Sequence, residues 1–239
     1  MKHNLILATK TQRHEGTRRK PLCSFVPLCL CGYLLLTILV LTSCKNPHSI
    51  IDHLPYYSGA DFTPQWMDKK ASDTVHIIPD FSFTNQDGHT ITRKDFDGKI
   101  TVVDFFFTTC PGICRQLTTG LMHVQAAYRN DPAVLLLSHS VTPEHDSVQV
   151  LKEYAKEHDA IPGKWHFVTG DRKSIYRIAR TAYFADEDMG WKKDSTTFLH
   201  TENILLIDKH HHIRGVYKGT ISLQINELIS DIEELETEE

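Results

Sequence analysis

Hydrophobic positions follow two alternating periods along residues 75–239, one typical of strands and the other of helices. Apolar runs that are too short to form helices predict buried strands. Between these runs, apolar residues recur three or four positions apart, which predicts amphipathic helices. The predicted strands cover residues 100–107, 133–138, 165–169, 198–208 and 213–218, and the predicted helices cover residues 112–128, 142–158, 172–183 and 225–235.

The N-terminal part of this region completes the predicted fold. Residues 76–83 alternate as a strand does, Asp87-Gly88 is a strong hairpin signal, and residues 90–92 supply the returning strand. Strands that alternate with helices form a sheet with helices on both faces. The sequence therefore predicts an α/β fold with a central mixed β-sheet flanked by helices and an N-terminal β-hairpin.

The start of the chain has the pattern of a secretory signal, with the basic residues 1–24 followed by the apolar residues 25–42. The apolar run ends in Leu41-Thr42-Ser43-Cys44, which resembles the lipobox of bacterial lipoproteins. That resemblance implies that Cys44 is lipidated and becomes the new N-terminus. An uncleaved signal-anchor helix is the alternative, since the run is about long enough to span a bilayer. Both interpretations tether the chain to the cell membrane, with the folded domain facing the periplasm or the cell exterior.

Residues 44–74 lack clear periodicity and contain three prolines and a glycine, which favours a tether. The predicted organisation is a signal sequence with lipobox over residues 1–43, a tether over residues 44–74 and a folded domain over residues 75–239. Residues 1–43 have a net charge of +5, so the remainder of this chain of net charge −4 carries −9. An acidic domain argues against nucleic acid as a partner, because phosphate binding needs a basic surface.

Six cysteines are present, and four of them lie in or beside the apolar N-terminal segment. The remaining pair, Cys110 and Cys114, follows the predicted strand at residues 100–107 and opens the next helix, where Pro111 fits a first turn. Four positions apart on a helix, the two side chains point the same way, and the helix N-terminus favours thiolate over thiol. Two thiolates on one face either bind a metal ion or exchange disulfides. A single pair makes a site rather than a disulfide framework.

The residues around this pair resemble a known family. The segment Phe107-Thr108-Thr109-Cys110-Pro111-Gly112-Ile113-Cys114 resembles the Sco (SenC) proteins, membrane-tethered copper proteins that help assemble the binuclear copper centre of cytochrome c oxidase. Residues 138–146 resemble the family's segment ending in Pro-Glu-Arg-Asp, and Phe198-Leu199-His200-Thr201 resembles the place of its histidine ligand. Over residues 75–237, the resemblance implies a thioredoxin-like fold and a copper site of Cys110, Cys114 and His200.

The chemistry of this donor set agrees with the implication, because two thiolates and one imidazole suit Cu(I) and hold Cu(II) with a further ligand. Three ligands leave a position open for a partner's ligand, whereas structural zinc usually takes four strong ligands. The resemblance implies a copper metallochaperone, not an enzyme in the strict sense, whose partner is the copper-site subunit of cytochrome c oxidase or another extracytoplasmic copper protein. Two departures from the family concern the tuning of the site: Arg115 replaces a frequent proline, and no acidic residue stands between the cysteines.

A thiol-disulfide oxidoreductase acting on an extracytoplasmic protein is the alternative, with Cys110 and Cys114 as catalytic residues that cycle through a redox-active disulfide. Ordinary thioredoxin-like proteins place a cis-proline at or beside the position of His200, so a histidine there favours the metal site. Asp104 is expected either as a buried proton acceptor beneath the cysteines, as in thioredoxins, or as a paired residue of the strand.

Fifteen histidines are present, so most of them are expected in the core or at the surface. His139 and His145 lie in a predicted loop after a strand and are weaker candidates for the site. Residues 210–212 form a histidine tract in a predicted turn and are expected to be solvated, although such tracts can bind metal adventitiously.

Overall fold

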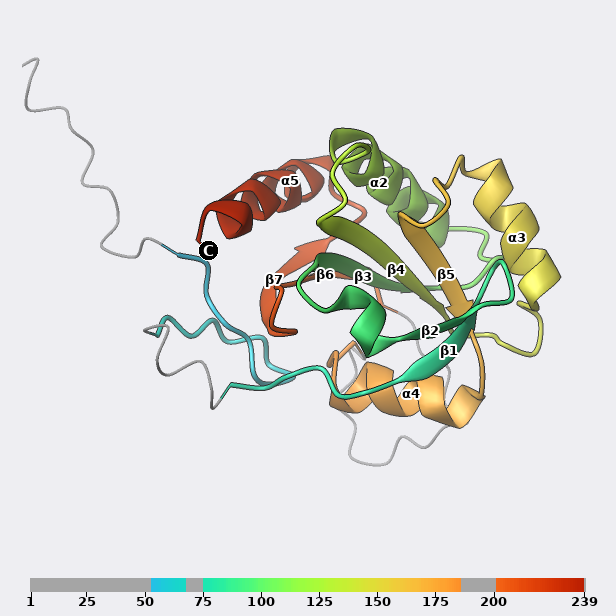
Figure 1. Ribbon diagram of the computed structural model, residues 1–239, viewed down its shortest axis with the longest axis horizontal. Coiled ribbons are helices and arrows are strands. Elements are labelled where there is room, and N and C mark those ends of the chain that lie inside the picture. Colours follow the sequence, from blue (N-terminus) through green and yellow to red (C-terminus); the bar gives the residue numbers. More distant parts are fainter. Residues whose placement is uncertain (1–52, 68–74, 186–200, 239) are drawn as a thin grey trace, which may run out of the picture. The chain divides into compact units, whose positions relative to one another are not determined.

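The computed structural model describes residues 53–67, 75–185 and 201–238. Among these residues no helix is both long and apolar enough to cross a membrane. Strands and helices alternate along the chain, as the sequence predicts (Figure 1). In chain order the elements are β1 (Ser82–Asn85), β2 (Thr90–Thr92), the 3-10 helix η2 (Arg93–Phe96), β3 (Ile100–Phe106), α2 (Ile113–Ala127), β4 (Val134–Ser140), α3 (Val148–Glu157), β5 (Trp165–Thr169), α4 (Arg172–Thr181), β6 (Asn203–Ile207), β7 (Ile213–Lys218) and α5 (Ser222–Thr237).

The strands of the described residues form one mixed sheet in the order β2-β1-β5-β4-β3-β6-β7. The central strands β3, β4 and β5 are parallel, and β3 aligns with β4 from Ile100↔Val134 to Phe106↔Ser140. The hairpin β1–β2 and the pair β6–β7 add antiparallel strands at the two edges. Helices cover both faces of the parallel strands, which explains why every residue of β3 and β4 is buried. The predicted mixed sheet and N-terminal hairpin are confirmed.

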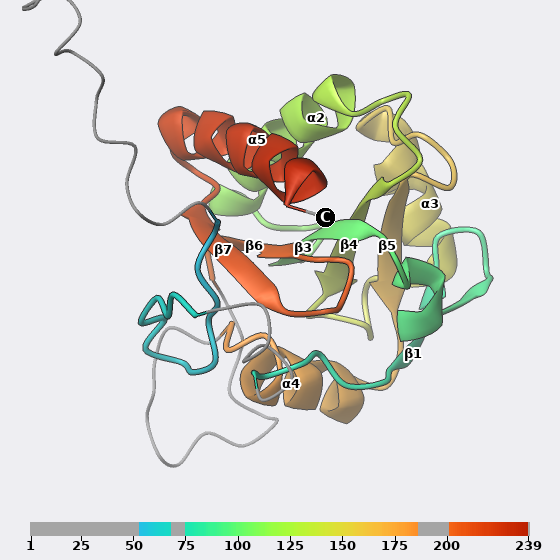
Figure 2. The same cartoon turned by 60° about the vertical axis from the view of Figure 1, so that its left-hand side comes forward.

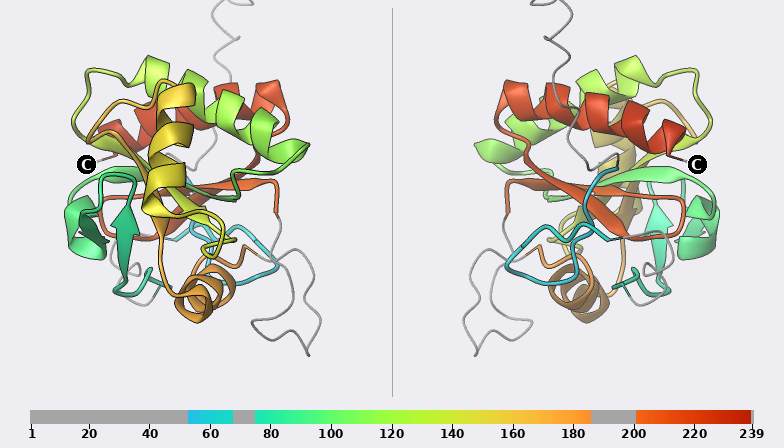
Figure 3. Two further views of the ribbon diagram at one scale, coloured as in Figure 1. Left: turned by 90° about the vertical axis from the view of Figure 1, so that its right-hand side faces the viewer. Right: turned by 90° about the vertical axis from the view of Figure 1, so that its left-hand side faces the viewer.

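The two faces of the sheet carry separate cores. Helices α2, α3 and α5 cover one face, where α2 and α5 lie side by side, and α4 covers the other (Figure 2, Figure 3). Because side chains alternate along a strand, Val102 and Phe106 of β3 pack beneath α2, whereas Val103 and Phe105 pack toward α4. Asp104 lies two residues from both Val102 and Phe106, so its side chain points to the same face of the sheet as theirs. It therefore lies on the face covered by the cysteine helix.

Part of the predicted tether belongs to the packed structure. Leu54 and Tyr56 are buried, and Tyr57 pairs with Ile213 at the free edge of β7. Packed residues thus begin before residue 75, where the periodic pattern starts. Single β-bridges and two buried side chains leave no periodic pattern, so this contact had no signal in the sequence.

Three elements begin several residues later than predicted. The strand predicted from residue 76 begins as β1 at Ser82. The helix predicted from residue 142 begins at Val148, because Ser147 caps it by accepting from the Val150 N–H while the preceding residues form a loop. The strand predicted from residue 198 begins at Asn203, and residues 186–200 lie outside the described part of the chain. All three shifts leave the order of the elements unchanged.

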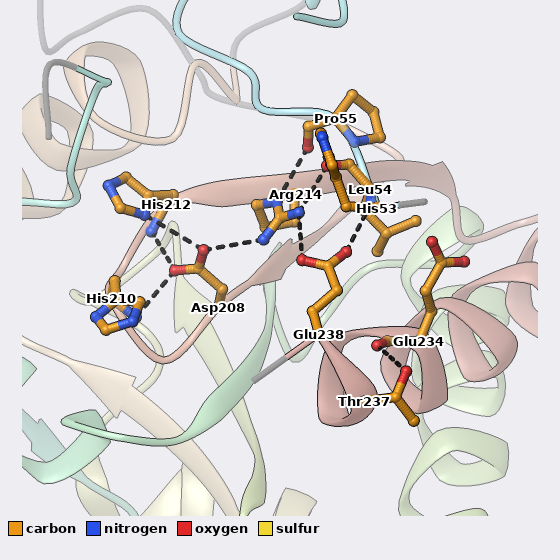
Figure 4. A network of polar contacts seen from close by, with 10 residues as sticks. All are labelled: His53, Leu54, Pro55, Asp208, His210, His212, Arg214, Glu234, Thr237 and Glu238. Carbon is orange, nitrogen blue, oxygen red and sulfur yellow. Dashed lines mark hydrogen bonds and ion pairs between the residues drawn. The ribbon is translucent and has the colours of Figure 1, made fainter. Parts of the chain in front are cut away.

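An ion network joins the N-terminal segment to the C-terminal helix (Figure 4). Arg214 of β7 is buried and donates to the carbonyl oxygen of Leu54 at 2.6 Å. Its guanidinium group also donates to Oδ2 of Asp208 at 3.3 Å and to Oε2 of Glu238 at 2.7 Å. Glu238 in turn accepts from the Leu54 N–H at 2.7 Å. The network therefore fixes residues 53–57 beside β7 and the end of α5.

The histidine tract forms the predicted turn, but it is not solvated as expected. His211 and His212 are buried; His211 contacts Asp97 at 2.7 Å through Nε2, and His212 contacts Asp208 at 3.3 Å through Nδ1. Burial acts to raise the pKa of Asp208, but hydrogen bonds from His212 and the charge of Arg214 outweigh it and hold the pKa below its ordinary value. Two of the three histidines are thus part of the packing at this end of the sheet.

Candidate metal centre

Cys110 and Cys114 lie just beyond the carboxyl end of β3, where the chain turns into α2. Gly112 directly precedes α2, and Cys114 is in its first turn. Cys114 is buried, Cys110 is half-buried, and both are free thiols. The Cys114 N–H donates to Sγ of Cys110 at 3.4 Å, and the two thiols are hydrogen-bonded to each other. The helix begins two residues after Pro111 rather than at it, yet the two sulfurs lie together, as their spacing predicts.

The two thiols differ in acidity because their mutual hydrogen bond acts on them in opposite directions. Burial acts to raise the pKa of Cys110, but hydrogen bonds with the Cys114 thiol and with the backbone of Gly112 and Cys114 outweigh it and lower that pKa. Burial raises the pKa of Cys114 to about 12, and the hydrogen bond with Cys110 adds to the rise. Cys110 is therefore the sulfur that ionises first and the one that a partner reaches first.

Asp104 lies within the core on the same face as the cysteines. It is 2% exposed, and its Oδ1 has no hydrogen-bond partner in the described part of the chain. Burial raises the pKa of Asp104 to about 7, although a hydrogen bond with Ser138 acts in the opposite direction. The charge of Asp104 in turn helps to raise the pKa of Cys114. Of the two roles expected for Asp104, the structure agrees with a buried titratable group near the thiols.

Asp146 holds the loop that carries Cys110. Its side chain is fully buried and accepts from Oγ1 of Thr108 at 2.6 Å, from Oγ of Ser140 at 2.6 Å and from Oγ1 of Thr142 at 2.9 Å. Thr108 precedes Cys110 by two residues, whereas Ser140 and Thr142 belong to the end of β4 and the loop that follows it. One carboxylate thus joins the cysteine loop to β4. Sequence reasoning missed this role, because Thr108 is 38 residues away in the chain.

The alternation of side chains along β4 separates His139 from the thiols. Its ring stacks on Phe105 with 5.1 Å between the ring centroids, among residues that pack toward α4. Neither ring nitrogen has a hydrogen-bond partner within the described residues, and burial lowers the pKa of His139 to about 3, so the ring is neutral. His145 is exposed in the loop before α3. In the described structure neither histidine forms a metal-binding group with the cysteines.

Two predicted site residues, His200 and Cys44, lie outside the described residues. Thr201, which follows His200 in the sequence, is buried, and β6 begins two residues later. Because β6 is antiparallel to β3, with Leu205 opposite Val103, β6 starts at the end of the sheet where β3 finishes. Among the residues that the structure describes, no group of three His, Cys, Asp or Glu side chains could hold a metal ion. The donors described at this end are the two sulfurs.

This arrangement supports two kinds of chemistry. Two adjacent sulfurs at a helix N-terminus fit a soft metal ion, which binds thiolates in preference to oxygen ligands. A half-buried thiol of lowered pKa beside a buried thiol of raised pKa also fits disulfide exchange, in which the exposed sulfur attacks first. Both uses need the reduced pair that the structure contains.

Comparison with known proteins shows similarity over most of the described residues. The family model described as SCO1/SenC matches residues 69–236. The SCO1 protein homolog of Bacillus subtilis is 26% identical over 162 residues, which represent 67% of this chain and 83% of that protein.

Solved structures show the same fold. The structure reported for a disulfide switch in BsSco, a member of the Sco family of cytochrome c oxidase assembly proteins, is 25% identical, covers 69% of this chain and 95% of that chain, and has a TM-score of 0.58. The structure of Bradyrhizobium japonicum ScoI with copper bound is 25% identical, covers 66% of this chain and 99% of that chain, and has a TM-score of 0.54. These likenesses confirm the predicted thioredoxin-like fold.

Proposed function

Since the chain belongs to the SCO1/SenC family, we propose that it is an extracytoplasmic copper metallochaperone that helps assemble the copper centre of cytochrome c oxidase. A copper-bound relative and a relative described as an oxidase assembly protein support this role. The partner is the copper-site subunit of the oxidase or another extracytoplasmic copper protein. Copper is the cargo of the reaction, held as Cu(I) or Cu(II) and passed on.

The observation that carries the proposal is the hydrogen bond from the Cys114 N–H to Sγ of Cys110, which brings the two free thiols together beyond the carboxyl end of β3. Cys110, with its lowered pKa, supplies a thiolate, and Cys114 loses its proton when a metal ion replaces it, as thiol ligands must. His200 is the proposed third ligand, supported by its place directly before Thr201 at the same end of the sheet. A three-ligand set keeps one position open, through which a partner's ligand takes over the ion.

The proposed location is the outer face of the cell membrane, with the chain anchored by lipid on Cys44. Its support is the sequence Leu41-Thr42-Ser43-Cys44 at the end of the apolar run. In this proposal residues 1–43 are the signal sequence, and the tether runs from Cys44 toward the packed residues that begin near His53.

Thiol-disulfide exchange is the second candidate, and the buried carboxyl of Asp104 is the observation that favours it. The Cys110 thiolate attacks a disulfide of the target, and the target's first sulfur leaves as a thiolate. Cys114 then attacks Sγ of Cys110, its proton passes to Asp104, and the target's second sulfur leaves. The target gains two electrons, and Cys110 and Cys114 end as a disulfide.

Copper titration of the full chain tests the first candidate and separates it from the second. We expect the reduced chain, with Cys23, Cys29, Cys31 and Cys44 replaced by serine, to bind one copper ion under anaerobic conditions. Cys110→Ser and Cys114→Ser each remove a ligand, so the loss of affinity should exceed the roughly 10–100-fold typical of an outer partner. His200→Ala should weaken Cu(II) binding strongly and Cu(I) binding less, because both thiolates remain.

The matched control is His145→Ala, which removes an exposed histidine near the same end and should leave both affinities unchanged. Equal copper affinity of the disulfide and dithiol forms would rule out the cysteines as ligands. Normal copper binding by His200→Ala together with lost disulfide reduction would favour the oxidoreductase.

A further inference from the structure

A groove of about 560 Å³ runs between α2 and α5 and begins one residue after Cys114. Gly120, Gly219 and Ile225 form its buried floor. The helices approach closely here, since a Cβ on Gly120 would lie 2.7 Å from Cδ1 of Ile225. Exposed polar side chains of both helices form the walls, among them Arg115, Thr119 and His123 of α2 and Asn226 of α5.

The charge of this groove is opposite to that of the domain around it. Residues 44–239 carry a net charge of −9, yet the titratable side chains that line the groove are Arg115 and His123, and no carboxylate lines it. Arg115 forms no ion pair with any residue that the structure describes. An exposed cation that has no ion pair among the described residues, on an acidic domain, attracts an acidic polypeptide at close range.

Apolar side chains stand exposed at the start of both helices. Five large apolar side chains are exposed among the described residues, and three of them belong here: Ile113 begins α2, and Ile221 and Leu223 lie at the start of α5. The loop before α5 also contacts the start of β6, because the Gly219 N–H donates to the carbonyl oxygen of Glu202 at 2.9 Å. The groove is thus continuous with the end of the sheet that carries the thiols. Clustered exposed apolar residues around a charged anchor are typical of interaction surfaces.

We propose that this groove docks an acidic, partly apolar segment of the protein that exchanges copper or a disulfide with Cys110. The proposal rests on the proposed function and adds the charge and the position of the partner's binding segment. Arg115 pairs with a carboxylate of that segment, while Ile221 and Leu223 contact its apolar side chains. Docking here brings the partner's sulfur beside the half-buried Cys110.

Thiol exchange with two short peptides tests the docking without copper. The protein is the full chain in neutral detergent, with Cys110 as the one remaining cysteine, carrying a 5-thio-2-nitrobenzoate mixed disulfide. Each ten-residue peptide has one cysteine and two leucines, flanked by glutamates in one peptide and by lysines in the other. The peptide thiolate attacks Sγ of Cys110, a new disulfide forms, and the coloured nitrothiobenzoate thiolate leaves. Each rate is divided by the rate of the same peptide with the mixed disulfide of free cysteine, which removes differences in intrinsic thiol reactivity.

We expect the acidic peptide to react about tenfold faster at low salt, with the preference lost at high salt. Arg115→Glu should remove the preference. Arg177→Glu makes the same charge change on α4, on the opposite face of the sheet, and should leave the preference intact. Leu223→Ser should slow both peptides, because it removes an apolar contact that they share.

Equal normalised rates for the two peptides would overturn the docking proposal, as would equal losses from Arg115→Glu and Arg177→Glu, since a general charge effect would then explain the preference. Copper titration of the parent chain keeps the two proposals apart. If the chain binds copper but shows no peptide preference, the proposed function stands and the docking proposal is rejected. If the chain prefers the acidic peptide but binds no copper, the docking proposal stands and the metallochaperone proposal is rejected.

Discussion

At the amino end of β3, the buried carboxylates of Asp208 and Glu238 contact the guanidinium group of Arg214. Toward the carboxyl end of β3, the carboxyl groups of Asp104 and Asp146 contact hydroxyl groups instead. Within the described residues, no lysine or arginine forms an ion pair with Asp104 or Asp146. Buried carboxyl groups thus lie at both ends of one sheet, and among the described residues a cation pairs with them at one end and not at the other.

The difference separates stability from chemistry. A buried carboxylate with an arginine beside it is neutralised by the protein itself, and residues from distant parts of the chain are joined at that point. Where hydroxyl groups replace the cation, positive charge must come from a proton or from whatever binds. That condition suits an end of the sheet where two sulfurs take up and release a positive ion or a proton.

Arg214→Met gives the largest expected effect on this comparison, because it leaves Asp208 and Glu238 buried without a counter-charge. Removing one partner of a buried ion pair costs about 3–5 kcal/mol, so we expect the free energy of unfolding to fall by that amount. Urea denaturation measures the change. Arg177→Met, an exposed arginine of α4, is the control and should change the free energy by less than about 0.5 kcal/mol.

Copper affinity of the folded Arg214→Met variant should equal that of the parent chain, because the substitution lies at the opposite end of the sheet. If Arg214→Met lowers the free energy of unfolding only slightly, the ion network around Arg214 does not stabilise the fold. If the variant is fully folded but binds copper more weakly, the two ends of the sheet are coupled.

Asp104→Asn gives the second effect, which depends on pH. The carboxyl ionises near its ordinary pKa of 3.8 in the unfolded chain and near 7 in the folded chain, so the folded state holds the proton more tightly between these values. The contribution of Asp104 to the stability of the parent chain should therefore fall as pH rises from about 4 to about 7 and become level above that. Asparagine does not ionise, so the variant should lack this fall.

Each pH unit in that window represents at most roughly 1.4 kcal/mol, and the slope flattens near pH 7, so the stability of the variant relative to the parent should rise by about 2 kcal/mol between pH 5 and pH 7. Urea midpoints measured at pH 5, 6 and 7 give the comparison. Parallel pH dependence in parent and variant would contradict the raised pKa of Asp104.

A pair of threonine substitutions gives the smallest effect and the finest test of the cysteine end. Thr108→Val and Thr142→Val each remove one hydrogen bond to the Asp146 carboxylate, of 2.6 Å and 2.9 Å respectively. Each substitution should lower the free energy of unfolding by about 1–2 kcal/mol. Thr108 belongs to the loop of Cys110, whereas Thr142 does not. We therefore expect the reduction potential of the Cys110–Cys114 pair, measured against glutathione buffers, to shift in Thr108→Val and to stay unchanged in Thr142→Val. Equal shifts of the reduction potential in both variants would show that Asp146 has only a structural role.

The order of strands and helices could be predicted from the sequence because burial imposes a period on each element. The parallel strands are covered on both faces, so their runs were visible, and α2 over Ile113–Ala127 lies within the predicted segment 112–128. The contact between Cys110 and Cys114 was predictable for the same reason, since it depends on spacing within one turn. Local patterns therefore gave the sulfur pair and its position after β3.

Contacts between distant residues could not be predicted in the same way. Asp146 accepts a hydrogen bond from the Thr108 hydroxyl across 38 residues, and Leu54 accepts one from Arg214 across 160 residues. Neither contact imposes a period on the sequence. The separation of His139 from the thiols depends on which face of β4 packs toward α4, and that is fixed by tertiary packing rather than by the apolar run.

The Arg214 network has a consequence for how far the domain can reach. It holds residues 53–57 at the amino end of β3, so the first described residues pack at the end of the sheet opposite the sulfurs. A seven-residue strand is about 20 Å long, and the nine residue steps from Cys44 to His53 span at most about 30 Å. If lipid is attached at Cys44 as proposed, these lengths keep the thiols within about 50 Å of the anchor. That distance is the upper limit of the height above the anchor at which the proposed chaperone can meet a partner's copper site.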